Sequence, residues 1–189
     1  MIFTKIQIAK NGTLQATFKN GDGDIVDFKG ANIVHNDLRE AMQALVPHLA
    51  LITEQREAYK TTLAKLREQR ITDDGENIYK RMSVDGINLT GDERKVSVSG
   101  CRILTKAGVI TVDTPTVDLD DGDYEYLNDL SLDIDAVKYE AQEYIEQRKW
   151  GVKEGSLEFK DIDPFNGIEA GDVPEAESSP KKGRKRKAA

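Results

Sequence analysis

The most concentrated chemical feature of the sequence is a basic segment near its C-terminal end. Seven consecutive residues contain six cations and no acid: Lys181, Lys182, Arg184, Lys185, Arg186 and Lys187. Six phosphate contacts would make binding fall with roughly the fifth power of salt concentration, because each contact releases counterions. Such contacts carry no information on base sequence. We therefore predict a non-specific nucleic-acid-binding segment, and a solubilising end or a nuclear-import-like address are the alternatives.

A stretch of opposite charge runs from residue 113 to residue 135. It contains no basic residue and nine acids: Asp113, Asp118, Asp120, Asp121, Asp123, Glu125, Asp129, Asp133 and Asp135. A calcium loop needs glycine at its sixth position, but Gly122 is the fifth residue counted from Asp118. We expect a solvated acidic loop that stabilises the start of the following helix. Mimicry of nucleic acid and docking of the protein's own basic segment are the alternatives.

Residues that commonly act in catalysis are sparse. His35 and His48 are the only histidines and neither has a partner at metal-ligand spacing, so we interpret both as structural. Cys101 is the only cysteine, and its strand-like surroundings favour packing. No phosphate-binding glycine loop, nucleophile elbow or H-E-x-x-H pattern occurs. The sequence predicts a non-enzymatic protein without metal or cofactor, and carboxylates assembled by the fold are the remaining route to an enzyme.

Aromatic residues beside cations give a second, weaker nucleic-acid signal, since bases stack on exposed rings near positive charge. Three such groups occur: Tyr59 with Lys60 and Lys65, Tyr79 with Lys80 and Arg81, and Trp150 with Arg148 and Lys149. Core packing explains each ring equally well.

The N-terminal part has the pattern of a three-stranded meander followed by a helix. Apolar residues alternate on both sides of Asn11-Gly12, a strong hairpin signal, and a second turn over residues 20–24 leads into a third run. From residue 38 to residue 52 the apolar period becomes helical, with Asp37 as the expected N-cap. Pro47 should kink or split this helix. Residues 54–70 are highly charged and predict a helical protrusion.

The C-terminal part repeats the order of strands and helix. Residues 78–112 have the pattern of strands, and a helical period returns from Ile134 to Arg148. We predict an α+β fold in which antiparallel strands form two meander-plus-helix units with packed helices. The expected domain covers residues 1–165 with a helical insertion at 53–77, and residues 166–189 form a disordered linker and basic tail.

Size and charge restrict the class of protein. A chain of 189 residues suits one core. Its net charge of −7 hides an asymmetry, because removing the six basic-segment cations from 27 leaves 21 against 34 acids, or −13. A single cysteine suits a reducing compartment, and neither a signal peptide nor a membrane-spanning run is visible. We expect a cytoplasmic protein with no membrane partner.

Several stretches resemble a group of uncharacterised bacteriophage and prophage proteins of Bacteroides-type bacteria. They lie at residues 34–38, 45–50, 98–100, 111–115 and 140–150. The resemblance covers about residues 30–150 and implies a setting in replication and recombination gene clusters, without an assigned catalytic residue. Some members of the group end in an acidic or Phe-tipped tail, whereas this chain ends in Arg and Lys.

These features together favour a phage accessory protein associated with DNA or with replication and recombination proteins, tethered by its basic tail. One alternative is a processivity-clamp-like ring subunit, which would be a homo-oligomer. Another is an anti-defence inhibitor that binds a host protein or a small molecule.

Overall fold

The computed structural model describes residues 1–71 and 77–151, which belong to one compact unit, Met1–Gly155. The predicted disordered linker and basic tail at 166–189 lie outside the described residues.

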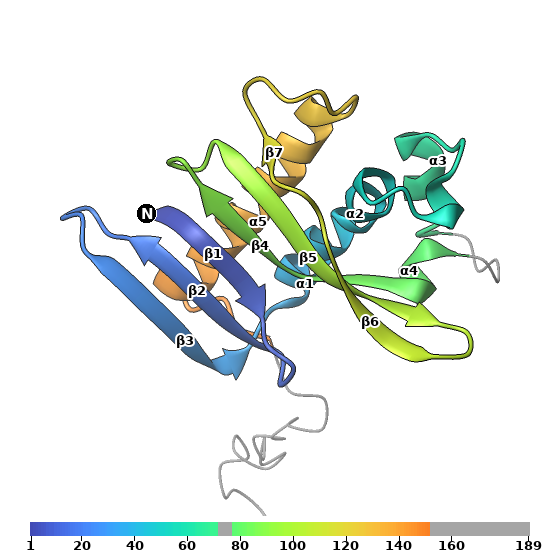
Figure 1. Ribbon diagram of the computed structural model, residues 1–189. Helices are drawn as coiled ribbons and strands as arrows, with labels where there is room; N and C mark the ends of the chain where they lie inside the picture. Colours follow the sequence, from blue (N-terminus) through green and yellow to red (C-terminus); the bar gives the residue numbers. More distant parts are fainter. Residues whose placement is uncertain (72–76, 152–189) are drawn as a thin grey trace, which may run out of the picture. The chain divides into compact units, whose positions relative to one another are not determined.

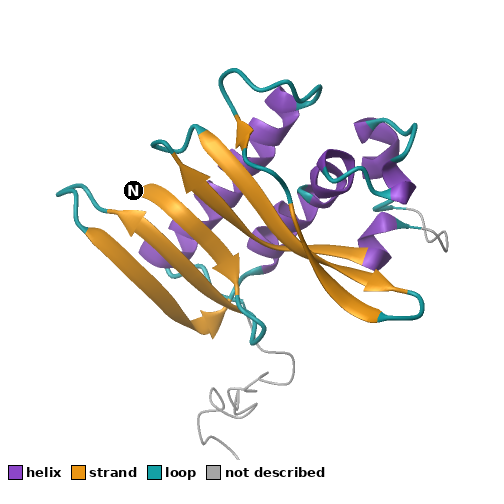
Figure 2. Cartoon of the chain, viewed as in Figure 1, coloured by secondary structure: helices purple, strands orange, loops and turns teal. Residues whose placement is uncertain are grey.

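A seven-stranded antiparallel sheet forms the centre of the unit (Figures 1 and 2). Its strands are β1 (Ile2–Ile8), β2 (Thr13–Lys19), β3 (Ile25–Ile33), β4 (Met82–Thr90), β5 (Lys95–Leu104), β6 (Gly108–Asp113) and β7 (Val117–Asp118). The strand order is β3-β2-β1-β4-β5-β6, and β7 pairs with β5 beyond the end of β6. Both predicted meanders are therefore present.

Helices lie on one face of the sheet and leave the other uncovered, which we call the open face (Figure 2). The helices are α1 (Asn36–Ala44), α2 (Val46–Ile52), α3 (Leu63–Glu68), α4 (Ile78–Arg81) and α5 (Leu127–Glu146), with a 3₁₀ turn η1 (Arg56–Ala58). α1 packs on α5, and their apolar stripes meet the apolar side of the strands. The predicted α+β class is confirmed.

The helix boundaries differ in part from the predicted ones. Pro47 does split the first helix, and α2 begins at Val46 with this proline in its first turn, where its missing N–H is not needed. The N-cap of α1 is His35 rather than Asp37, because the His35 ring accepts a hydrogen bond from the Asp37 N–H at 3.3 Å. In the described part of the expected helical insertion at 53–77, the helical elements are η1 and α3. Residues Ile78–Arg81 also form a helix where a strand is predicted.

The acidic stretch is not purely a loop, because α5 begins at Leu127. Asp129, Asp133 and Asp135 therefore lie on the first turns of a helix. Only Asp129 lies in the first turn itself, where a carboxylate is favourable near the positive end of the helix dipole.

The two meanders are related by an approximate two-fold axis between β1 and β4. These strands run antiparallel with Ile6 opposite Ile87, so residue n of β1 corresponds to residue n+81 of β4. A register irregularity lies between Phe3 and Lys5 in β1, and another lies at the corresponding place, between Val84 and Gly86, in β4. Strands of the same curvature therefore occur in both halves.

The helices follow the same relation. α1 contacts β4 of the other half, and α5 contacts β1. Arg39 on α1 lies between buried Leu38 and Met42, as Lys138 on α5 lies between buried Val137 and Ala141. The two cations thus hold corresponding places on their helices.

Candidate functional site

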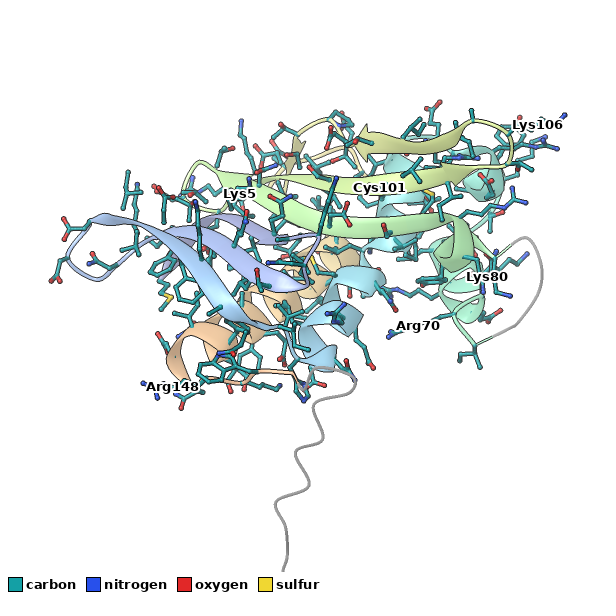
Figure 3. The ribbon with its side chains drawn as sticks, turned by 90° about the horizontal axis from the view of Figure 1, so that it is seen from below. Lys5, Arg70, Lys80, Cys101, Lys106 and Arg148 are labelled. Atoms are coloured by element: carbon teal, nitrogen blue, oxygen red, sulfur yellow. The ribbon has the colours of Figure 1, made fainter. Side chains whose placement is uncertain are left out.

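Cations gather where η1, α3, α4 and the β5–β6 turn meet, and we call this region the basic end. Residues 56–71, 77–81 and 102–108 contain two acids, Glu57 and Glu68, and nine cations: Arg56, Lys60, Lys65, Arg67, Arg70, Lys80, Arg81, Arg102 and Lys106. Figure 3 shows Arg70, Lys80 and Lys106 at this end of the unit. Residues 72–76, outside the described part, add Asp73, Asp74 and Glu76 to the sequence. The region remains net positive with these acids included.

Part of this charge is used within the fold. Glu57 Oε1 accepts from Arg102 at 2.8 Å and from Arg81 at 3.3 Å, which joins η1 to β5 and α4. Burial opposes ionisation of Glu57, but its own backbone hydrogen bond and the two guanidinium groups hold its pKa below the usual value. Arg81 and Arg102 are therefore structural cations.

Arg67 and Arg70 are also paired, with acids of α5 and α1, whereas four cations of the basic end are exposed: Arg56, Lys60, Lys65 and Lys106. The described residues show no ion pair for Arg56, Lys65 or Lys106, while Lys60 lies over the Tyr59 ring with Nζ 5.1 Å from its centroid. Tyr59 is 72% exposed, so its ring is open to a partner. These residues form the candidate nucleic-acid interface.

The two other aromatic groups singled out from the sequence behave differently. Tyr79 packs against the core, and burial raises its pKa. Trp150 is partly exposed and pairs with Val34 through an isolated bridge. Tyr59 is the most exposed of the three rings at 72%, against 42% for Trp150, and it lies at the basic end.

The helices that cover the sheet have the opposite charge. α1 and α5 carry two cations, Arg39 and Lys138, and eight acids: Asp37, Glu40, Asp129, Asp133, Asp135, Glu140, Glu143 and Glu146. Phosphate is repelled by such a surface and attracted to the basic end.

The open face of the sheet is polar over β1, β2 and β4, while over β5 and β6 it carries the exposed side chains of Ile103 and Val109. Its outward positions include Lys5, Gln7, Gln15, Thr17 and Asn88, and Figure 3 shows Lys5 on this side. The aromatic rings of the described strands, Phe3, Phe18 and Phe28, all pack in the core instead. This face therefore offers hydrogen bonds but no ring on which a base could stack.

His48 lies in a buried polar network between α2 and α5. The ring is 0% exposed, with Nε2 3.2 Å from Asp133 Oδ2 and Nδ1 2.9 Å from the Tyr124 hydroxyl. A carboxylate can only accept, so in the neutral ring Nε2 donates to Asp133 and Nδ1 accepts from Tyr124. Arg67 also binds Asp133, at 2.9 Å, and Asp129, at 2.8 Å. This network holds α3 to α5.

A cleft of about 480 Å³ opens between the β1–β2 turn, α1 and the start of β4, and we call it the first cleft. Its lining consists of Gln7, Ile8, Ala9, Lys10, Gly12, Arg39, Met42, Gln43, Ser83, Val84, Asp85 and Cys101. The Cys101 thiol donates to Asp85 Oδ2 at 3.0 Å. This hydrogen bond, with burial and the Asp85 charge, raises the pKa of Cys101 to about 11.

The sequence-predicted site residues are only partly placed by the structure. Lys181, Lys182, Arg184, Lys185, Arg186 and Lys187 lie outside the described residues. The first cleft was missed, because Lys10 and Arg39 are distant in sequence and belong to different elements. The only early signal was the Asn11-Gly12 turn, which places Lys10 at the tip of a hairpin.

Within residues 1–71 and 77–151, no three His, Cys, Asp or Glu side chains are grouped so that they could hold a metal ion. None of the described helices combines the length and apolarity needed to cross a bilayer.

No protein-family model, curated protein or solved structure matches this chain.

Proposed function

We propose that this protein is a non-enzymatic, cytoplasmic accessory protein that associates with DNA through its basic end and its basic segment 181–187. The observation that carries the proposal is the separation of charge in the fold. Nine cations and two acids lie at the basic end, whereas α1 and α5 carry eight acids and two cations. The resemblance to phage replication-cluster proteins agrees with this setting.

Charge separation on this scale would orient the protein on a polyanion. The acidic helices repel phosphate while Arg56, Lys60, Lys65 and Lys106 attract it, so DNA approaches the basic end. The exposed Tyr59 ring beside Lys60 can stack on an unpaired base. A preference for single strands or for duplex ends follows.

The described polar groups support a binding role rather than catalysis. His48 is fully buried, with both ring nitrogens engaged by Tyr124 and Asp133. The Cys101 thiol has a pKa raised to about 11, which disfavours the thiolate a nucleophile needs. Neither group is prepared to attack a substrate.

The proposal is tested by the salt dependence of DNA binding. Fluorescence anisotropy with labelled single-stranded and duplex oligonucleotides gives the slope of log K against log salt concentration. Replacing Lys60, Lys65 and Lys106 by Ala removes three phosphate contacts and should reduce the slope by about 3. Deleting residues 180–189 removes six cations and should reduce it by about 5.

A matched control replaces Lys5 and Lys29, exposed cations of β1 and β3, by Ala. This variant should bind DNA with the parent's slope. Replacing Tyr59 by Leu should weaken single-strand binding and leave duplex binding unchanged. A parent protein without measurable DNA affinity at low salt, or equal losses in basic-end and control variants, would refute the proposal.

The duplicated fold gives a specific reason to keep the ring-subunit alternative. Two meander-plus-helix halves joined through β1 and β4 leave β3 and β6 at the sheet edges, where subunits could join. The helix face of such a ring is acidic, so DNA would have to contact a different surface. Light scattering decides this alternative, because a monomer at micromolar concentration cannot encircle DNA.

A further inference from the structure

The first cleft has a counterpart in the other half of the molecule. This second cleft, of about 170 Å³, is lined by Ile2, Phe3, Thr4, Lys19, Leu89, Thr90, Gly91, Asp92 and Glu93. By the correspondence of residue n with residue n+81, Ile2, Phe3 and Thr4 of the second cleft match Ser83, Val84 and Asp85 of the first. In the same way, Ile8 and Ala9 of the first cleft match Leu89 and Thr90 of the second. The two clefts are thus the same place in two copies of one scaffold.

The second cleft is occupied by a carboxylate of the chain itself. Glu93 Oε1 accepts from the Phe3 N–H at 2.6 Å, and Glu93 Oε2 pairs with Lys138 Nζ at 2.6 Å. Lys19 in the same cleft pairs with Asp92 at 3.7 Å. The turn that carries both acids, residues 91–94, is one residue longer than residues 10–12 of the first half. An internal anion therefore neutralises this copy.

The first cleft has the cations but no carboxylate at the place of Glu93, and its one acid, Asp85, accepts from the Cys101 thiol. Arg39 takes the place of Lys138 on its helix, and Lys10 lies in the shorter turn. Neither has an ion pair with any described residue. Gly12 stands at the position that corresponds to Glu93, so this turn has no side chain there. A Cβ at Gly12 would lie 2.9 Å from Arg39 Nη2, which shows that the guanidinium lies against the turn.

Both elements of the first cleft are held in place before any ligand binds. The Asn11 side chain accepts from the Thr13 N–H at 3.2 Å and from its hydroxyl at 2.9 Å. Val34 N–H donates to the Gly12 carbonyl at 2.8 Å, which fixes the turn to the end of β3. Buried Leu38 and Met42 fix α1. A rigid site loses little free energy in ordering on binding.

We propose that the first cleft binds a nucleoside-monophosphate-sized organic phosphate, whose anionic group takes the place that the Glu93 carboxylate holds in the second cleft. Lys10 and Arg39 bind the phosphate, and Arg39 can do so through two parallel N–H groups. Ile8, Met42 and Val84 supply apolar surface for a flat ring. Gln7, Gln43 and Asp85 supply polar partners, and Asp85 selects a ligand that donates hydrogen bonds. The volume lies within the range typical of small-molecule sites.

Isothermal titration calorimetry of the full chain with the four ribonucleoside monophosphates tests this site. At least one should bind at one per chain, and adenosine and inorganic phosphate alone should each bind at least about tenfold more weakly. Lys10→Met or Arg39→Met should weaken binding by about tenfold or more, because each removes a charged hydrogen-bond donor. Lys5→Met, on the open face, is the matched control and should bind like the parent.

The variant Gly12→Glu is a second test of the site, in which both Lys10 and Arg39 are kept. Glu93 has a φ of 69° in the other turn, but a side chain at the φ of 80° of Gly12 is strained, so the unfolding midpoint of this variant is measured beside its binding. The new carboxylate should pair with Arg39 and abolish ligand binding, while circular dichroism shows a folded protein. The proposal is overturned if no nucleotide binds at millimolar concentration, if nucleosides bind as well as their phosphates, or if Lys10→Met and Arg39→Met bind like Lys5→Met. Because this test uses no DNA, its result is independent of the proposed function.

Discussion

Removing the carboxylate of Asp85 should make Cys101 more reactive, by an amount that can be worked out. Cys101 donates to Asp85 Oδ2 at 3.0 Å, and its pKa is raised to about 11 from an ordinary value of 9.0. At pH 8 the thiolate fraction is about 0.1% at the raised pKa and about 10% at the ordinary one. Asp85→Ala should therefore increase the thiolate up to about 100-fold.

The rate should rise less than the thiolate fraction, because a thiolate of lower pKa is a weaker nucleophile. With a Brønsted coefficient of about 0.4–0.5, two pKa units reduce intrinsic reactivity about 6- to 10-fold. The expected net gain at pH 8 is therefore at most about 10- to 15-fold. Burial also raises the pKa of Cys101 and persists in the variant, so the measured gain should fall somewhat below this limit.

Reaction with Ellman's reagent measures this directly, since Cys101 is the only thiol of the chain. The pH–rate profile of the parent should still be rising at pH 10, whereas that of Asp85→Ala should bend at lower pH. Asp85→Asn keeps an acceptor but loses the charge, and should give an intermediate profile. Identical profiles for all three proteins would show that Asp85 does not control this thiol.

Two further predictions concern the fold. A Cβ at Gly100 would overlap the Ser83 carbonyl oxygen and lie 2.8 Å from Leu49 Cδ2, so Gly100→Ala should lower the free energy of unfolding by about 1–3 kcal/mol in urea titrations. Gly21→Ala, with nothing within 4 Å of its Cβ, should change it by less than about 0.5 kcal/mol, and equal effects would refute the packing argument. Glu57 has a lowered folded-state pKa, so its ion pairs stabilise the fold above its unfolded pKa near 4.5 and this stability is lost as pH falls through the folded value. Between pH 7 and pH 3 the parent's urea midpoint should therefore fall more than that of Glu57→Gln, and parallel curves would contradict the assignment.

Local features of the fold were predictable from the sequence. Asn11-Gly12 between alternating runs defines the first hairpin, because few residues suit its turn, and Pro47 determines where the first helix divides. The predicted helix boundaries were wrong where contacts with neighbouring residues in space determine where a helix begins. His35 caps α1 through its ring, an uncommon cap, and Leu127 begins α5 although acids flank it.

The candidate sites were less predictable because they depend on pairing between distant segments. The contact of β1 with β4 brings Lys10 and Asp85 to one cleft across 75 residues of chain, and no local pattern encodes it. The basic end likewise requires α4 and the β5–β6 turn to meet. The sequence revealed cations beside Tyr59, but not that Tyr59 would be exposed and Tyr79 buried.

The approximate two-fold axis allows the features that both halves share to be distinguished from the features that occur in one half only. Ile6 and Ile87, the two register irregularities and the cations Arg39 and Lys138 occur in both halves, so the scaffold itself accounts for them. The halves differ in two features. The turn between β4 and β5 carries Glu93, and the segment between α2 and β4 contains most of the basic end. Lys138 pairs with Glu93 of the second turn and with Asp135 of its own helix, whereas the described residues show no ion pair for Arg39. The difference between Gly12 and Glu93 is the residue choice that leaves Arg39 without a carboxylate from its turn, and the proposed binding of a phosphate in the first cleft rests on that difference.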